Sequence, residues 1–221
     1  MNRISLVSLH ARGASATARA DAAYMHLKER LLEGDLGAGD KLSVVDLTRT
    51  LACSRVPVME ALKRLAGDGF VQIVPQVGCR VVTPRAADVR DFFTLFAAAE
   101  STVAAFAAAR RTAADVVEFK HLCAEIDRLT RRAGKPADRD PAYRRINLMF
   151  HGRIHELARS PVTTAIAAGM WDRSDFYIKL AFGSLYFSRA VKDAHLAIRA
   201  AVIGGDAAAS SRATRDHLER V

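Results

Sequence analysis

The sequence predicts a mainly α-helical protein in which three helices and a small β-hairpin precede an all-α bundle. Half of its 221 residues are apolar but only 7% are aromatic, and the abundant alanine favours helices over sheets. Helical spacing of apolar residues and helix-capping signals recur along most of the chain. Two-residue periodicity is confined to residues 71–82, so the sheet is expected to be small.

The first helix is predicted over residues 18–33, where the apolar side chains follow 3.6-residue spacing. Residues 1–17 contain no acidic residue and are expected to form a flexible N-terminal arm. A glycine-rich loop follows the helix. Ser43 and Asp46 then have the spacing of a capping box, which predicts a second helix that ends near Ala52.

The third helix is predicted from the stretch CSRVPVMEALKRL, residues 53–65. Ser54 is a good N-cap, and Pro57 then falls in the first turn, where its missing N–H costs nothing. Arg55 stands at the exposed end of this helix. A short capped helix with arginine at its N-terminus is typical of elements that enter a DNA groove.

Residues 71–82 predict a β-hairpin with a glycine at its turn. Three helices followed by a hairpin is the order of a winged helix-turn-helix. Pro84 and the polar residues up to 88 mark a boundary. We therefore expect a DNA-binding domain over residues 18–84 and a second domain over residues 88–221.

The second domain is predicted to contain about six helices and no strand. Thr112 and Asp115 form another capping box. Ser160 is an N-cap followed by a proline at the first helical position. The sequence Gly-Gly-Asp at residues 204–206 gives a glycine stop and then a new N-cap.

The net charge of +9 indicates a polyanionic partner but does not locate its site. Residues 1–88 hold 12 Lys/Arg and 9 Asp/Glu, so the positive excess is not concentrated there. The apolar run 92–109 is nearly long enough to span a bilayer. It contains Glu100 and is mostly alanine, so we expect a buried helix and no membrane partner.

The three cysteines, Cys53, Cys79 and Cys123, are widely spaced and form no C-x-x-C pair. They are typical of idle thiols in a reducing compartment. No secretory signal is evident. A cytoplasmic location is expected.

The stretch SRVPVMEALKRLAGDGFVQIVPQVGCRV, residues 54–81, resembles the winged helix of the GntR family of bacterial transcription regulators. INLMFHGRIHELARSP, KDAHLAIRAAVIGGD and RATRDHLERV resemble the FCD effector domain of that family, with the six-helix VanR-like branch as the candidate subgroup. Together these segments cover about residues 18–221. The resemblance implies a homodimeric regulator, with repression preferred over activation, that binds double-stranded operator DNA. A small effector in the helical half would adjust its operator affinity.

The resemblance places the DNA contacts on the third helix and the hairpin. The candidate residues are Ser54, Arg55, Val56, Gln76, Gly78 and Arg80. Arg55 is the main candidate for a base or phosphate contact. Members of the family usually carry an arginine where this chain has Met59, so one expected contact is missing.

Three histidines in the helical half are candidate metal ligands. Asn147 and His151 are four residues apart and share a helical face, whereas His195 and His217 belong to two later helices. The resemblance implies that these four residues bind a divalent ion, with Zn, Ni, Mn and Fe all chemically suitable. FCD domains usually have aspartate where this chain has Asn147, which predicts weaker metal binding.

A metal site of this kind favours a small organic acid, with a carboxylate that completes the metal's coordination, as the effector. The candidate lining residues are His155, Arg173 and Tyr177. FCD domains often have an arginine four residues before the first-helix glutamate, Glu100, and this chain has Phe96 there.

Two alternatives remain open at this stage. A metal-dependent helical enzyme with a vestigial DNA-binding module needs a general base near the histidines, and no carboxylate at motif spacing supplies one. In the other alternative the pocket is metal-free and the histidines bind the effector directly.

Overall fold

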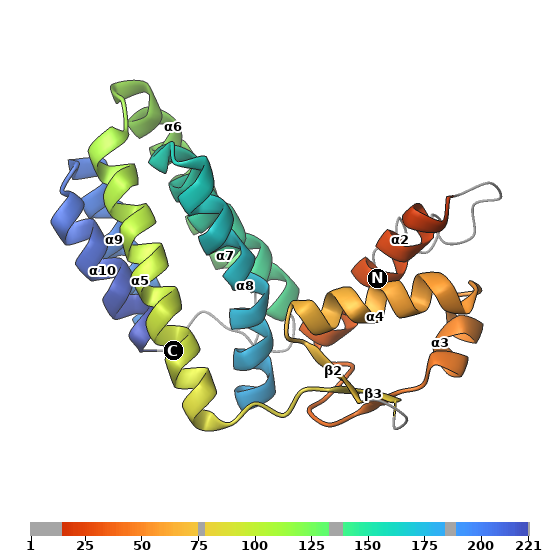
Figure 1. Cartoon of the computed structure of the whole chain (residues 1–221). Coiled ribbons are helices and arrows are strands. Elements are labelled where there is room, and N and C mark those ends of the chain that lie inside the picture. Colours follow the sequence, from red (N-terminus) through yellow and green to blue (C-terminus); the bar gives the residue numbers. More distant parts are fainter. Residues whose placement is uncertain (1–14, 75–77, 133–138, 184–188, 221) are drawn as a thin grey trace. The chain divides into compact units, whose positions relative to one another are not determined.

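The computed structural model describes residues 15–74, 78–132, 139–183 and 189–220. The chain divides into two compact units. One comprises residues 1–84 with 179–183, and the other comprises residues 85–178 with 184–221 (Figure 1).

The described part of the first unit contains the three predicted helices and a three-stranded antiparallel sheet, of which the sequence predicts two strands. Its elements are α2 (Ala16–Glu33), β1 (Lys41–Leu42), α3 (Val44–Thr50), α4 (Arg55–Gly67), β2 (Val71–Val74) and β3 (Gly78–Val81). The strand order is β1-β3-β2. The hairpin β2–β3 was predicted, but β1 was not, because two residues are too few to create a periodic pattern. The predicted N-terminal arm lies outside the described residues up to residue 14, and its last residues belong to α2.

Helices α2 and α4 pack against each other through leucines that are almost completely buried, among them Leu27, Leu31, Leu62 and Leu65. Polar contacts join the same two helices at their surface. The Tyr24 hydroxyl donates to Asp68 at 2.6 Å, and Arg64 both pairs with Asp21 at 2.5 Å and lies over the Tyr24 ring. This support holds α4 in place and leaves its N-terminal end exposed.

The two helix starts of the helix-turn-helix differ in their capping. The Ser43 side chain accepts a hydrogen bond from the backbone N–H of Asp46, which confirms that cap. Ser54 is the N-cap residue of α4, as predicted, but its side chain makes no capping bond. Between the helices, Ala52 has φ of +48°, a left-handed conformation that is unfavourable for a residue with a Cβ.

The second unit consists of helices in its described part, as predicted. They are α5 (Ala86–Arg110), α6 (Ala113–Arg132), α7 (Arg139–Ala158), α8 (Pro161–Phe182), α9 (Arg189–Gly204) and α10 (Ala207–Glu219). Its main core gathers apolar side chains of α5, α6, α7 and α9, including Val103, Phe119, Phe150 and Ile198. A smaller cluster joins α5 to α8 through Phe96 and Trp171, whose ring centroids are 4.9 Å apart.

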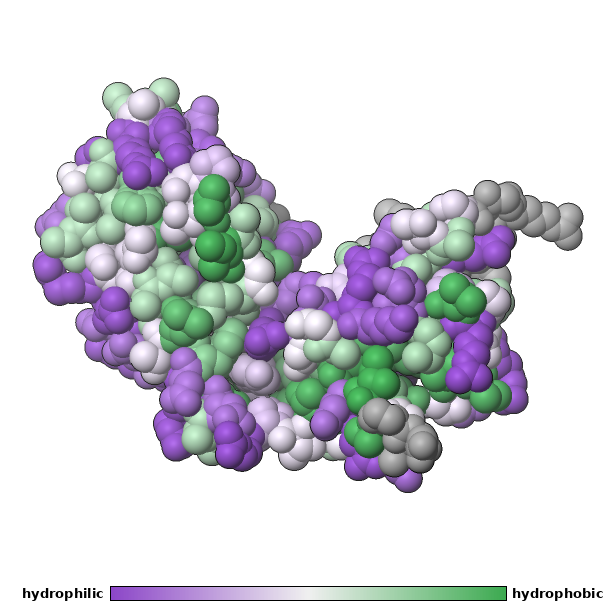
Figure 2. Space-filling view, in the orientation of Figure 1, coloured by the Kyte–Doolittle hydropathy of each residue, from purple (hydrophilic) through white to green (hydrophobic). Residues whose placement is uncertain are grey.

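Helix α5 has the length and apolar composition of a membrane span, but it is a core helix, with Val103 and Ala107 completely buried. Both α5 and α8 also carry exposed apolar side chains. Figure 2 shows hydrophobic residues over both helices on the face toward the viewer. Leu95 of α5 is 63% exposed, and Val162 and Ile166 of α8 are 75% and 64% exposed.

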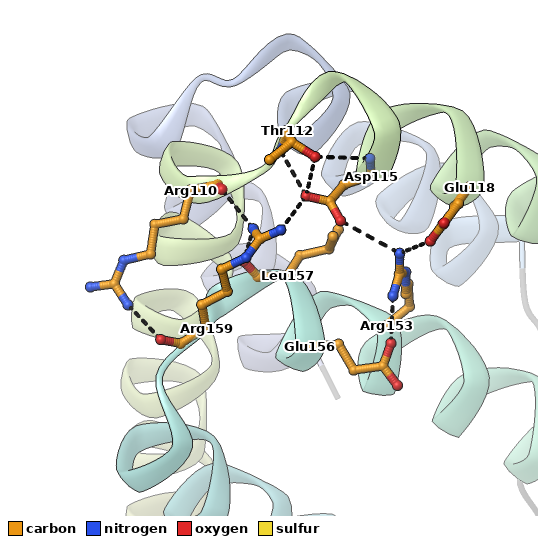
Figure 3. A network of polar contacts seen from close by, with 8 residues as sticks. All are labelled: Arg110, Thr112, Asp115, Glu118, Arg153, Glu156, Leu157 and Arg159. Carbon is orange, nitrogen blue, oxygen red and sulfur yellow. Dashed lines mark hydrogen bonds and ion pairs between the residues drawn. The ribbon is translucent and has the colours of Figure 1, made fainter.

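A polar network fastens the α5–α6 corner to the end of α7 (Figure 3). Asp115 and Thr112 form the predicted capping box in both directions, since Asp115 accepts from the Thr112 N–H at 2.7 Å and donates its own N–H to the Thr112 hydroxyl. Asp115 also accepts from Arg159 at 2.5 Å. Arg153 of α7 pairs with Glu118 of α6, and within its own helix with Glu156. The two Arg residues therefore join segments more than thirty positions apart in sequence.

Candidate functional site

The N-terminal end of α4 presents an exposed polar surface. Ser54, Arg55 and Val56 are all exposed, and the Val56 side chain is 71% exposed. Pro57 and Val58 in the next two positions are buried and anchor the first turn. Within the described part of the chain Arg55 forms no ion pair, so its guanidinium is available to an outside acceptor. A free helix N-terminus next to a free arginine is a good partner for phosphate oxygens.

The hairpin presents a second positive surface. Cys79 and Val81 of β3 point into the core, and Arg80 between them lies on the outer face. Arg80 pairs in register with Gln72 of β2 and with Lys41 of β1. Lys41 is therefore a candidate contact that the sequence did not suggest, because its strand was not predicted.

Gly78 and Gln76 are the other two predicted DNA contacts of the hairpin. Gly78 has φ of +122°, which favours glycine at the start of β3. Gln76 lies outside the described residues.

The three predicted histidines come together in the second unit. His151 of α7, His195 of α9 and His217 of α10 each offer a ring nitrogen, and these nitrogens all lie within 4.8 Å of one another. The ring centroid of His151 lies 5.3 Å from that of His195 and 5.8 Å from that of His217. We call these residues the histidine cluster. Three imidazoles at this separation can converge on one metal ion, after small side-chain adjustments.

The histidine cluster is held in the neutral form. Burial lowers the pKa of His195 to about 3 and that of His217 to about 4. The pKa of His151 also lies well below its usual range, because of burial first and the neighbouring imidazoles second. A neutral imidazole has a free lone pair at neutral pH, which is the form that ligates metals.

Buried polar atoms around the cluster lack partners within the described residues. They include Asn147 Oδ1, His151 Nε2 and Thr214 Oγ1. Asn147 lies one turn before His151 on α7, and Thr214 lies one turn before His217 on α10. An unpartnered buried acceptor is costly. The combination of neutral imidazoles and an unsatisfied amide oxygen fits the donor set of a divalent ion. Sequence reasoning missed Thr214, which carries no motif signal.

A carboxylate lies beside the cluster. Glu100 of α5 is 1% exposed and accepts hydrogen bonds from His155 Nε2 and Trp171 Nε1, both at 2.8 Å. Its other oxygen is 4.0 Å from His151 Nδ1. The sequence pointed to His155 as pocket lining, and the structure gives it this carboxylate as a partner.

The predicted pocket residues do not line a cavity that the described residues form in the second unit. Tyr177 packs edge-on against Phe92, with the ring centroids 5.1 Å apart, and Arg173 is partly buried on α8. The cavity lies between α6, α7 and α9, and His195 is the member of the histidine cluster that borders it.

A winged helix-turn-helix joined to a helical unit with a polar centre defines the class of DNA-binding transcription regulators. Residues 19–81 match the gntR family of bacterial regulatory proteins, and residues 91–220 match the FCD domain. The chain belongs to the GntR family and carries an FCD domain. This family consists of transcription regulators and not of enzymes, so the enzyme alternative has no support.

Several relatives carry matching descriptions. The chain is 26% identical over 202 residues to the uncharacterized HTH-type regulator BphR of Paraburkholderia xenovorans, covering 90% of this chain and 82% of that one. It is 25% identical to the HTH-type transcriptional repressor GlaR of Escherichia coli, covering 88% and 90%. A regulator of Agrobacterium vitis is 29% identical over 99 residues, which span 45% of this chain and only 58% of that relative.

Solved structures share the fold. McbR/YncC of E. coli superposes with a TM-score of 0.70 at 19% identity, covering 91% of this chain and 93% of that one. A GntR regulator from Rhodococcus sp. RHA1 has a TM-score of 0.71 at 20% identity, covering 92% and 95%.

Proposed function

We propose that this protein is a homodimeric cytoplasmic repressor whose operator affinity is adjusted by a small organic acid bound in a metal-containing FCD domain. The observation that carries the sensing half is the convergence of three neutral imidazoles within 4.8 Å beside the unsatisfied amide of Asn147. The domains would be residues 18–84 and 88–221. The six helices of the described FCD unit favour the VanR-like branch, and the relative GlaR is named a repressor.

The DNA-binding half would use the exposed start of α4 and the outer face of the hairpin. Arg55 would reach a base edge or phosphate, Ser54 would donate to phosphate, and Arg80 would follow the adjacent groove together with Gln76. Val56 would offer only an apolar contact. Gly78 has no side chain, so the hairpin could approach the DNA backbone closely at this position.

Fluorescence anisotropy with the protein's own promoter region tests this assignment. Arg55→Ala should weaken binding at least tenfold and lower the slope of log affinity against log salt concentration. Arg128→Ala, at an exposed position of α6, is the matched control and should change neither. Unchanged promoter binding by Arg55→Ala would refute the assignment.

The sensing half would hold a divalent ion through His151, His195, His217 and the Asn147 amide oxygen. A bound ion would supply a Lewis-acidic position for a carboxylate oxygen. Glu100 orients His155 and Trp171 and lies next to His151, so it would adjust the electrostatics of the site. Arg173 and Tyr177 remain candidate effector contacts on α8.

Metal analysis of the full-length protein after zinc-supplemented expression tests the site. One equivalent per chain is expected, and His151→Ala should lose it. His121→Ala removes an exposed histidine of α6 and should retain the metal. Metal well below one equivalent in the unaltered protein would favour a metal-free pocket in which the histidines contact the effector themselves.

The dimer would form through the apolar face of α5 and α8. Leu95 of α5 and Val162 and Ile166 of α8 are large apolar side chains that solvent reaches, and burial of such side chains favours self-association. Ile166→Glu should give a monomer by sedimentation velocity and lose operator affinity. Val117→Glu, on α6 and 55% exposed, should remain dimeric. A dimeric Ile166→Glu protein would exclude this interface.

A further inference from the structure

A cavity of about 210 Å³ lies between α6, α7 and α9 in the FCD unit. Its lining residues are Cys123, Ile126, Asp127, Thr130, Arg131, Phe150, Lys192, His195, Leu196 and Arg199. It is lined differently from the pocket that the sequence suggested, and no resemblance assigns a role to its charged residues. Its chemistry divides into an apolar part and a cationic part.

The apolar part is formed by side chains of all three helices. Cys123, Ile126 and Phe150 are buried, and Leu196 adds an apolar rim that is 54% exposed. Burial raises the pKa of the Cys123 thiol to about 11, so this side chain is uncharged at neutral pH. These surfaces suit an apolar ring or a short hydrocarbon segment.

The cationic part consists of Arg131, Lys192 and Arg199. Arg199 is already paired with Asp127 at 3.0 Å, which offsets its charge. Arg131 and Lys192 are exposed and form no ion pair among the described residues. Two positive charges at the border of the cavity are therefore available to an anion.

The cavity also touches the histidine cluster. The His195 ring stacks on Phe150, with centroids 4.7 Å apart, and both rings line the cavity. Lys192 lies one turn before His195 on α9 and so shares its face. An occupant that fills the cavity therefore contacts the same imidazole whose nitrogen belongs to the cluster.

We propose that this cavity binds an organic acid with an apolar body about the size of one or two aromatic rings, whose anionic group is held by Lys192 and Arg131. The acid's body packs against Phe150, Ile126 and Leu196 and touches His195. This site is separate from the metal-bound acid of the proposed function, and it rests on that function only for a link to operator affinity. Binding itself requires neither DNA nor metal.

The test compares 2-naphthoate with 2-naphthol, which has the same rings and no charge, by calorimetry on the full chain. Metal-free and zinc-loaded protein are both titrated. Naphthoate should bind to both forms, and Lys192→Gln should weaken it about 5- to 10-fold, the usual cost of a lost charge-assisted bond. Binding of naphthol should be the same in Lys192→Gln as in the unaltered protein.

Two further variants sharpen the result. Leu196→Glu removes an apolar contact and places a negative charge on the exposed rim, so it should abolish naphthoate binding and weaken naphthol binding only by the lost contact. Lys120→Gln removes one positive charge from an exposed position of α6 that does not line the cavity, and it should leave both affinities unchanged.

The outcomes separate this inference from the proposed function. Naphthoate affinity that is unchanged in Lys192→Gln combined with Arg131→Gln overturns the inference. Naphthoate binding that appears only with zinc and is lost in His217→Ala also overturns it, because the acid would then sit on the metal as the proposed function alone requires. The expected variant pattern without any effect of naphthoate on operator affinity supports the cavity as a binding site and removes only its link to operator affinity.

Discussion

The buried amide of Asn147 allows a prediction in which stability and metal affinity move in opposite directions. Asn147 is 4% exposed and its Oδ1 has no partner among the described residues. An unsatisfied buried acceptor costs about 1–3 kcal/mol. Asn147→Asp keeps the shape and adds a charge, and Asn147→Leu removes the polar atoms. If the amide is a metal ligand, each variant should change the unfolding free energy of the metal-free protein and its zinc affinity in opposite directions.

For Asn147→Asp, burial of an uncompensated carboxylate should lower the unfolding free energy of the metal-free protein by about 1–3 kcal/mol. With zinc the added charge should tighten binding about tenfold. At a free zinc concentration of 100 times the original Kd, stabilisation by binding then rises from about 2.7 to about 4.1 kcal/mol. Asn147→Leu should leave the metal-free protein as stable as before, or up to about 2 kcal/mol more stable, and should reduce the shift with zinc.

The assay is thermal unfolding followed by circular dichroism, with chelator-treated and zinc-loaded samples of all three proteins. A change of 1 kcal/mol moves Tm by about 3–5 °C in a unit of this size. The reasoning is refuted if both variants lower the Tm of the metal-free protein and leave the zinc-induced shift untouched. That result would assign Asn147 a purely structural role.

Three further predictions concern stability. Ala52→Gly relieves the left-handed backbone at φ of +48° and should raise the unfolding free energy of the DNA-binding unit by about 1 kcal/mol, measured by urea denaturation. Asp115→Ala removes the helix cap and the Arg159 pair, and should lower the stability of the FCD unit by about 2 kcal/mol, measured by calorimetry. Burial raises the pKa of Asp175 to about 6, so the folded state binds this proton more tightly than the unfolded state. The resulting stabilisation is full only below the unfolded pKa near 3.8 and is lost as the pH rises through 6, a fall of roughly 2 kcal/mol between pH 4 and 7.5, measured by urea denaturation over that range against Asp175→Asn.

Each of these has a control. Ala18→Gly, at an exposed helical position of the same unit as Ala52, should be destabilising. Glu118→Ala removes an exposed member of the network in Figure 3 and should have little effect, so a loss as large as that of Asp115→Ala would contradict the central place of Asp115. Parallel pH profiles of the unaltered protein and Asp175→Asn would show that this carboxyl does not carry the pH dependence.

Much of the fold was predictable because its signals are local. Helical spacing, the capping pairs Ser43–Asp46 and Thr112–Asp115, and the Gly-Gly-Asp stop before α10 all act within a few residues. The two-residue strand β1 was missed because its formation depends on pairing with β3, about forty residues away. Ser54 is the N-cap residue of α4, as predicted, but its side chain does not make the expected capping hydrogen bond. The orientation of a side chain depends on its surroundings, which the local sequence does not contain.

The site was predictable to the extent that a motif marked it. The three histidines were predicted as a set from the resemblance to the FCD domain, and the structure brings all three together. The partnership of Glu100 with His155 and Trp171 joins three helices and has no sequence spacing of its own. The cavity was missed for the same reason, because it exists only where three helices pack.

Trp171 connects the histidine cluster to helix α8 by direct contact. Its ring lies 4.4 Å from that of His151 and its N–H is held by Glu100, so any reorientation of His151 must be accommodated by Trp171. Trp171 belongs to α8, whose opposite side carries the exposed Ile166. If the cluster binds a metal ion and α8 takes part in a dimer interface, as proposed above, a change of ligation at His151 would reach that interface through the single side chain of Trp171.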